Sequence, residues 1–125
     1  MKPEEIDTLE TYLRRIFHNE RFEVRALPQD GRAEVMISGV PAGKIVRDDE
    51  DEDLSYNFAM TLPQGHDLEP TLRTVLGHPG IEARQRTVND GSVEIYLEDE
   101  FVGVVSQNKG VYEFDMAILD YDLEA

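Results

Sequence analysis

The densest cluster of potentially reactive side chains is the acidic run Asp48–Asp53, six consecutive carboxylates within "RDDEDEDLSYNF". Clustered carboxylates can bind Ca²⁺ or Mg²⁺. Counted from Asp49, an EF-hand loop would need glycine at its sixth position and glutamate at its twelfth, where this chain has Leu54 and Met60. We therefore expect no specific metal site. The run is interpreted as a solvated hairpin tip, with a contact for a basic partner as the alternative.

The other reactive side chains form no catalytic pattern. The chain contains no cysteine, which excludes thiolate catalysis and disulfides. Its three histidines, His18, His66 and His78, do not have the spacing of convergent metal ligands. Its serines lack a GxSxG elbow, and neither a GxGxxG loop nor a P-loop occurs. We expect no catalytic, cofactor-binding or metal-binding residues, and hence a protein that is not an enzyme.

Composition and charge limit the classes of partner. A chain of 125 residues with 40% apolar and 31% charged residues is expected to fold as one compact domain, residues 1–125. Its formal charge of -15 repels phosphate backbones and anionic lipid headgroups, so we expect neither nucleic-acid nor membrane binding. The start "MKPEEIDTLE" lacks the pattern of a signal peptide, and we expect a cytoplasmic protein.

The two halves of the chain resemble each other in three collinear blocks. "YLRRIFHNERFEVRA" aligns with "TLRTVLGHPGIEARQ", "DGRAEVMISGVPAG" with "DGSVEIYLEDEFVG", and "YNFAMTL" with "YEFDMAI". This order indicates a tandem duplication with repeats at 1–62 and 63–125. Where the first repeat has "VRDDEDEDLSYNF", the second has the shorter "VSQNKGVYEF", so the scaffold does not need the acidic run.

Each repeat is predicted to be a helix followed by four strands. The strands are expected at about 22–27, 33–38, 42–47 and 55–62, and at 81–87, 92–98, 101–106 and 111–123. Short hairpins force antiparallel pairing, and each helix must cover the apolar face of the sheet. The prediction is an α+β fold of two tandem α-β-β-β-β units, with helices on one face and a pseudo-two-fold axis. One continuous curved sheet and two packed units both remain open.

The strand pattern also predicts a register. A turn at Asp99–Glu100 would place Leu97 opposite Val102. In the last strand the apolar positions change parity at 118/119, which predicts a β-bulge or a change of sheet there. This register turns five large apolar side chains away from the helices, towards the other half or a partner. They are Met36, Ile45, Tyr96, Phe101 and Val105.

The segments "SYNFAM", "FVGVV" and "EFDMAILDYDL" resemble a small bacterial family of unknown function. Its members are single units that open with "MKPEEI"-like and "YLRR"-like segments and end with an acidic hairpin and an "NFxMAILDxDL"-like strand. This chain departs from that pattern by being doubled, by lacking the acidic tip in its second copy, and by having "AMTLPQG" at the end of its first. The resemblance implies a fold and no reaction. If single units pair as homodimers, this chain is a covalent version of that pair.

These observations favour an acidic, non-enzymatic protein-interaction module that self-associates or binds another protein through an apolar sheet face with an acidic rim. The alternatives are an acidic chaperone or DNA-mimic-like factor that shields a basic partner, and a small-molecule-binding protein. No cofactor is expected. The candidate partner-binding residues are Met36, Ile45, Tyr96, Phe101, Val105, Asp48, Asp49, Glu50, Asp51, Glu52 and Asp53.

Overall fold

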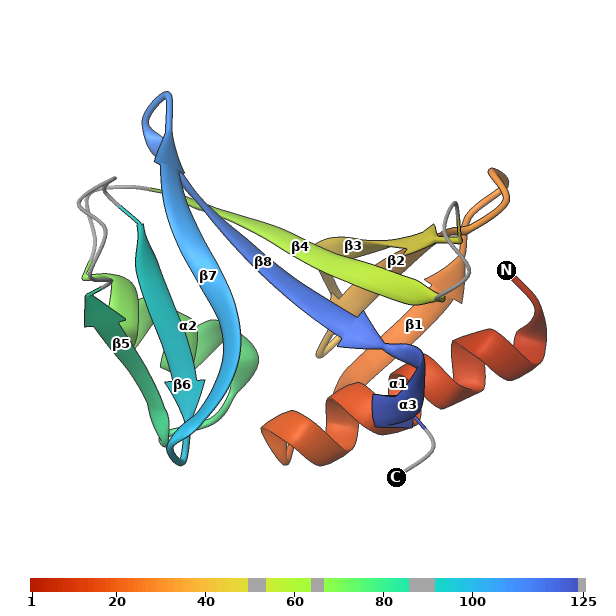
Figure 1. The fold of residues 1–125 in the computed structure, drawn as a ribbon, viewed down its shortest axis with the longest axis horizontal. Helices are drawn as coiled ribbons and strands as arrows, with labels where there is room; N and C mark the ends of the chain where they lie inside the picture. Colours follow the sequence, from red (N-terminus) through yellow and green to blue (C-terminus); the bar gives the residue numbers. More distant parts are fainter. Residues whose placement is uncertain (50–53, 64–66, 86–91, 124–125) are drawn as a thin grey trace.

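The computed structural model describes residues 1–49, 54–63, 67–85 and 92–123, and shows an α+β fold (Figure 1). Within these ranges, three helices accompany one eight-stranded antiparallel sheet. The helices are α1 (Pro3–Phe17), α2 (Leu68–Leu76) and α3 (Asp120–Leu123). The strands of the first repeat, unit one, are β1 (Phe22–Ala26), β2 (Arg32–Ile37), β3 (Val40–Asp48) and β4 (Ser55–Pro63). Those of the second repeat, unit two, are β5 (Ile81–Gln85), β6 (Val93–Leu97), β7 (Glu100–Asn108) and β8 (Val111–Leu119).

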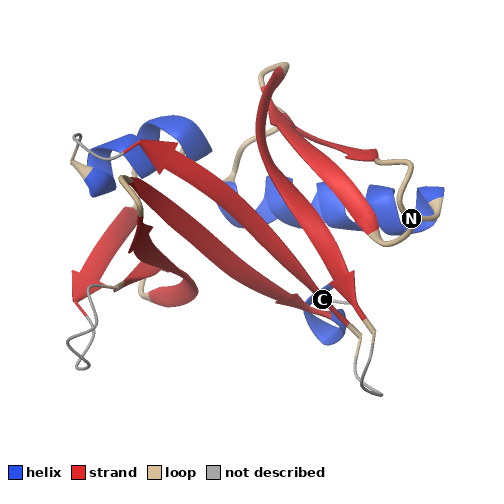
Figure 2. Ribbon diagram, turned by 90° about the horizontal axis from the view of Figure 1, so that it is seen from above, coloured by secondary structure: helices blue, strands red, loops and turns tan. Residues whose placement is uncertain are grey.

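The two units share a single sheet, with the strand order β1-β2-β3-β4-β8-β7-β6-β5. The last strands of the two units, β4 and β8, pair along their whole length, from Ser55 opposite Leu119 to Pro63 opposite Val111. Figures 1 and 2 show these two long strands side by side through the middle of the molecule. Of the two arrangements that the sequence leaves open, the structure has the continuous sheet.

The long helices begin and end as their sequences indicate. Pro3 opens α1, where its missing N–H costs nothing. The helix stops at His18, which adopts the left-handed conformation (φ 48°), and α2 stops in the same way at Gly77 (φ 75°). The side chain of Asp67 precedes α2 without a capping hydrogen bond. None of the helices in the described ranges is long and apolar enough to cross a bilayer.

Burial alternates along the central strands and defines two faces of the sheet. The apolar face carries the buried side chains of β4 and β8, among which the rings of Phe58 and Phe114 meet edge to face at 6.1 Å. These residues form one cluster with Leu9 and Leu13 of α1 and Leu72 of α2. The polar face carries the intervening side chains, which are exposed or half-buried. Burial of this kind supplies the main driving force for folding.

The predicted register of the β6–β7 hairpin is wrong, because the turn lies one residue earlier than predicted. The turn residues are Glu98 and Asp99, both with positive φ (53° and 70°), and Leu97 lies opposite Glu100 instead of Val102. Two residues of positive φ give the turn a twist that matches the flanking strands. A bulge follows, because Tyr96 lies opposite Phe101 while Ile95 lies opposite Gly103. The extra residue reverses the facing of the rest of β7.

The end of β8 also differs from the prediction. The strand stops at Leu119 and the chain turns into α3, so neither a β-bulge nor a change of sheet occurs at 118/119. The side chain of Asp122 accepts a hydrogen bond from the Leu119 N–H at 3.1 Å, which holds the turn. Leu123 then packs against the core, whereas Tyr121 stays 68% exposed. The parity change in the sequence marks a helical turn.

Two glycines allow β3 and β7 to approach the central strands closely. The β2–β3 hairpin has its bulge at Val35/Met36, which matches the bulge at Ile95/Tyr96 in the alignment of the repeats. Gly43 and Gly103 lie directly after these bulges. A Cβ atom at Gly43 would overlap the carbonyl oxygen of Ala59, and one at Gly103 would lie 2.5 Å from that of Asp115. Only glycine fits at either position.

We predict that Gly43→Ala and Gly103→Ala each lower the free energy of unfolding by about 1–3 kcal/mol, because the new methyl group displaces a central strand. Denaturant unfolding measures this loss. Gly39→Asn is the control, since Gly39 (φ 78°) lies in a hairpin turn where an added Cβ atom would have no neighbour within 4 Å, and Asn tolerates that backbone. Equal stability of the two alanine variants and the control would contradict the close approach.

Candidate functional site

An aromatic–arginine cluster lies on the polar face of unit two and includes the exposed ring of Phe101. Tyr96 of β6 lies opposite Phe101 of β7, and their rings meet edge to face at 5.8 Å. The guanidinium of Arg84, on β5, lies 4.1 Å from the centre of the Tyr96 ring. Phe101 is 54% exposed. Aromatic residues and arginine are enriched where proteins bind one another.

Carboxylates hold this cluster in place. Arg84 pairs with Glu82 at 3.0 Å and with Asp99 at 2.7 Å, and these hydrogen bonds raise its pKa. The Tyr96 hydroxyl donates to Glu94 at 3.2 Å, and this bond, followed by burial, raises the pKa of Tyr96. Tyr96 therefore stays a neutral donor at physiological pH.

The corresponding place in unit one has a different chemistry. Met36 lies opposite Pro41 there, at the positions that align with Tyr96 and Phe101. Met36 is only 7% exposed and lies outside the main core cluster. The aromatic cluster thus belongs to unit two alone.

The predicted orientation of Ile45 and Val105 is wrong. Both side chains lie in the core cluster, 0% and 1% exposed, and neither is open to a partner. The reason is the bulge in each unit, because one extra residue moves every later side chain of the strand to the opposite face. Ile45 consequently lies opposite Ala33, and Val105 opposite Val93, on the apolar face.

Of the acidic run, the structure describes Asp48 and Asp49, which are both exposed. Asp49 turns back towards the sheet and lies 3.4 Å from the Nε atom of Arg47. The predicted partner contacts at Glu50, Asp51, Glu52 and Asp53 lie outside the described residues.

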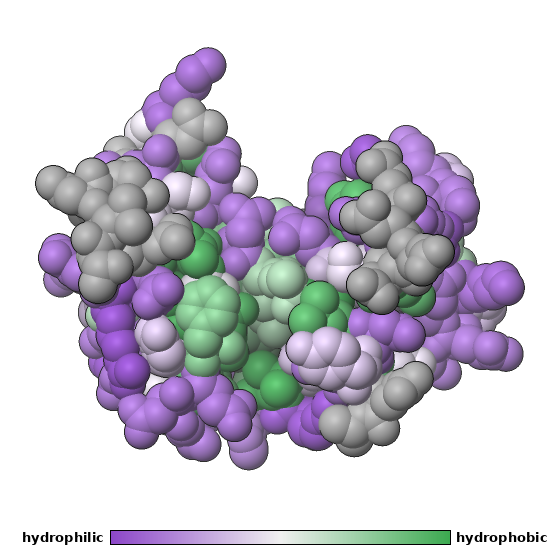
Figure 3. Space-filling model, viewed as in Figure 1, coloured by the Kyte–Doolittle hydropathy of each residue, from purple (hydrophilic) through white to green (hydrophobic). Residues whose placement is uncertain are grey.

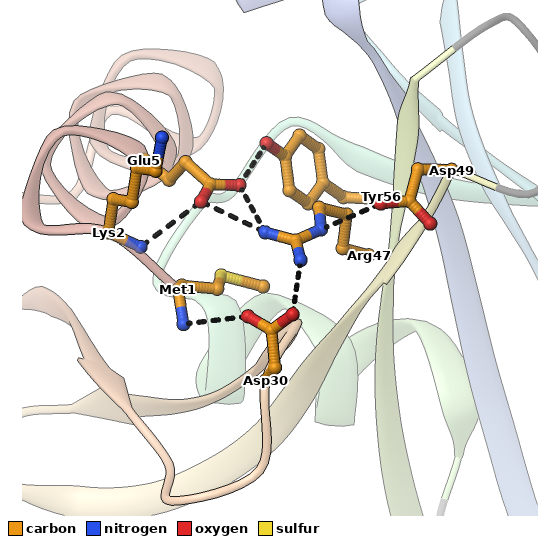
Figure 4. A network of polar contacts seen from close by, with 7 residues as sticks. All are labelled: Met1, Lys2, Glu5, Asp30, Arg47, Asp49 and Tyr56. Carbon is orange, nitrogen blue, oxygen red and sulfur yellow. Dashed lines mark hydrogen bonds and ion pairs between the residues drawn. The ribbon is translucent and has the colours of Figure 1, made fainter.

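Arg47 is the centre of a polar network at the base of that run (Figure 4). Its guanidinium donates to both carboxylate oxygens of Glu5, at 3.0 and 3.1 Å, and to Asp30 at 2.9 Å. The Tyr56 hydroxyl donates to Glu5 at 2.8 Å. The network joins α1, the β1–β2 loop, β3 and β4. In unit two the residue opposite Tyr112, where Arg47 would stand, is Gln107.

The network changes the acidity of its members. Burial alone would raise the pKa of Glu5, but hydrogen bonds from the Lys2 backbone N–H, Tyr56 and Arg47 outweigh it, and the pKa is lowered. Burial, and then the hydrogen bond to Glu5, raise the pKa of Tyr56. Because the polar groups of this network bond to one another within the chain, we assign the network a structural role at the N-terminal end of α1.

A second charged arrangement occurs in both units and was missed from the sequence. Glu10 accepts a hydrogen bond from the Val24 N–H at 2.9 Å, and Arg14 donates to the Phe22 carbonyl at 2.8 Å. The same groups in unit two are Glu69 with the Ala83 N–H at 2.9 Å, and Arg73 with the Ile81 carbonyl at 2.9 Å. In each unit the helix thereby provides hydrogen-bond partners for backbone N–H and C=O groups on the outer strand, which is β1 in unit one and β5 in unit two. The repeated Glu-x-x-x-Arg spacing could have indicated it.

Two histidines meet where the C-terminal ends of α1 and α2 come together. The rings of His18 and His78 are 5.3 Å apart, and Asn19 donates to the Leu76 carbonyl at 2.9 Å. The Nδ1 atom of buried His78 accepts a hydrogen bond from the Gly80 N–H at 2.8 Å, so this nitrogen is not free to bind a metal. Among the described residues, no three histidine or acidic side chains are grouped to hold a metal ion.

A family model described as "Protein of unknown function (DUF3126)" matches residues 5–64 and, a second time, residues 66–122. The chain belongs to this family. The two DUF3126 matches confirm the tandem duplication of a single unit, with the boundary between them at the link from β4 to α2. No curated protein and no solved structure matches the chain.

We predict that Glu5→Gln flattens the acid side of the stability curve. A carboxylate with a lowered pKa contributes stability that is fully present above its ordinary value of 4.5 and is lost as the pH falls through the lowered value. Urea unfolding at a series of pH values measures the difference. Glu4→Gln, which removes an exposed charge in the same helical turn, is the control. The lowered pKa is contradicted if Glu5→Gln and the wild-type protein lose stability equally on acidification.

Proposed function

We propose that this protein is a non-enzymatic interaction module that binds a protein partner through the polar face of unit two, with Phe101 as the central contact. The observation that carries the proposal is the exposure of Phe101, 54%, beside a tyrosine and an arginine that are fixed in place. An exposed aromatic group next to ordered polar neighbours can bind without a large loss of side-chain entropy.

The proposal includes a pseudo-two-fold axis between the units. Its support is the strand order, which reads through equivalent strands outward from β4 and β8. The register of β4 with β8 supports the axis further, because Ala59 lies opposite Asp115, the residue that aligns with Ala59 in the second repeat. Phe58 likewise lies opposite Met116, and Met60 lies opposite Phe114. A two-fold axis requires this, because it would exchange Phe58 with Phe114 and Met60 with Met116.

We further propose that both long helices lie on the apolar face, which leaves the polar face for a partner. The support is the single core cluster that takes Leu13 from α1 and Leu72 from α2 together with the buried side chains of β4 and β8. A face that is filled from within cannot also bind a partner. In the space-filling view, apolar residues are visible in the middle of the molecule and hydrophilic residues form most of the margin (Figure 3).

Charge favours a partner that differs from the chain itself. Glu98, Asp99 and Glu100 directly precede Phe101, and the chain carries a formal charge of -15, so a second copy would meet like charge. We propose a partner with an apolar anchor and a basic surround. The acidic surround accelerates association, and the apolar anchor supplies most of the affinity.

Phe101→Ser is predicted to weaken capture of the partner at least about ten-fold while the thermal midpoint stays unchanged, because the ring is exposed. The measurement is affinity capture with the tagged chain from native lysate, quantified by mass spectrometry at low and high salt. Val40→Ser, which removes a 62% exposed apolar side chain at the start of β3, is the matched control.

The control should retain the partner, and high salt should weaken capture only modestly. Unfolding of Phe101→Ser would show an internal packing role for the ring, and unchanged capture would remove Phe101 from the interface. Complete release by salt would instead favour the shielding of a basic partner by charge alone.

A further inference from the structure

A cavity of about 360 Å³ lies on unit one beside β2 and β3, far along the sheet from the Phe101 cluster. Its walls come from the β1–β2 loop and from the two strands. The lining residues are Leu27, Gln29, Arg32, Lys44, Ile45 and Val46. Apolar and cationic groups therefore meet in one place, as they do in sites for small organic ligands.

Two basic side chains, Arg32 and Lys44, line this cavity. Within the described residues, the side chains of Arg32 and Lys44 have neither a hydrogen bond nor an ion pair. Arg14, Arg25, Arg47, Arg73 and Arg84, by contrast, each pair with a carboxylate. With 27 acidic and 12 basic residues, carboxylates are plentiful, and yet these two neighbouring cations form no ion pair with a described carboxylate.

The strand register explains why these two side chains converge. Arg32 lies opposite Val46, and Glu34 lies opposite Lys44, so Arg32 and Lys44 are diagonal neighbours. Diagonal neighbours are roughly 7–8 Å apart, a separation that an arginine and a lysine can bridge through one anionic group. Val46, 38% exposed, lies beside them as an apolar surface. Glu34 lies opposite Lys44, but the two side chains form no ion pair within 4.0 Å in the described structure.

Unit two provides an internal comparison. The positions that align with Arg32 and Lys44 are Ser92 and Val104, and Glu94 lies opposite Val104 as Glu34 lies opposite Lys44. The same strand pairing therefore forms without either cation. Neither Arg32 nor Lys44 is needed for the scaffold, and their presence in unit one alone asks for another explanation.

We propose that this cavity binds a small organic anion, whose carboxylate or phosphate lies between Arg32 and Lys44 while its apolar body rests on Leu27 and Val46. Arginine suits both oxyanions because its guanidinium donates two parallel hydrogen bonds, and lysine adds a point charge. The apolar wall distinguishes an organic anion from an inorganic one. This site is independent of the protein partner proposed for unit two.

The test is a heteronuclear NMR titration of the full chain at low salt, with phenyl phosphate, benzoate, inorganic phosphate and benzyl alcohol as separate probes. We expect saturable shifts at the amides of Arg32, Lys44 and Val46 with phenyl phosphate or benzoate below about 10 mM. Inorganic phosphate and benzyl alcohol should bind at least several-fold more weakly. The comparison of the two aromatic anions identifies which oxyanion the site prefers.

The variants Arg32→Gln and Lys44→Gln should each weaken binding about ten-fold. Arg21→Gln is the matched control, because Arg21 is an exposed arginine outside the cavity and its loss changes the net charge by the same amount. The proposal is overturned if no probe gives saturable shifts, if the shifts are spread over the whole surface, or if Arg21→Gln weakens binding as much as the other two.

Discussion

The pairing of β4 with β8 is the interaction on which the rest of this structure depends. All nine residues of each strand take part, and the paired side chains on the apolar face, Phe58, Met60, Phe114 and Met116, occupy the middle of the core. Each unit alone would have about 60 residues and one open strand edge, a combination that gives a small core and invites aggregation. The outer edges of the sheet are protected separately, because Glu10 with Arg14, and Glu69 with Arg73, bind the backbone of β1 and β5. The two inner strands, β4 and β8, therefore pair with each other, and the two outer strands, β1 and β5, are covered by side chains of the helices.

A duplicated scaffold lets the two units differ wherever the fold does not depend on a residue. The bulges, Gly43 and Gly103, and the helix-to-edge contacts are the same in both units. The Arg47 network and the cationic cavity occur in unit one, and the aromatic cluster around Phe101 occurs in unit two. Features that the copies share are explained by stability. Those that only one copy has are the better candidates for binding, unless, as for Arg47, every polar group already has an internal partner.

The repeat and the fold class could be predicted from the sequence because turn glycines, aromatic residues and alternation recur in order. The register could not, since a bulge adds one residue without a sequence signal strong enough to locate it, and Ile45 and Val105 were assigned to the wrong face for that reason. The Arg47 network was also beyond reach, because Glu5 and Arg47 are brought together only by tertiary structure. The alternation in "ILDYDL" predicts a longer strand than β8, because it resembles a strand pattern, whereas the Asp122 side chain stabilises a turn there. The prediction that Tyr96 and Phe101 share one face is confirmed, because the pairing before the bulge shifts from Val102 to Glu100, an even number of residues that keeps each side chain on its predicted face.

Native-state hydrogen exchange of the Phe58→Ala variant tests the central role of the β4–β8 pairing most directly. Phe58 is fully buried, and its loss should cost about 3–5 kcal/mol. If the paired strands hold both units in one cooperative structure, protection will fall by the same free energy in β1–β3 of unit one and in β5–β7 of unit two. Loss of protection confined to residues 1–63, with unit two exchanging as in the wild-type protein, would contradict the account.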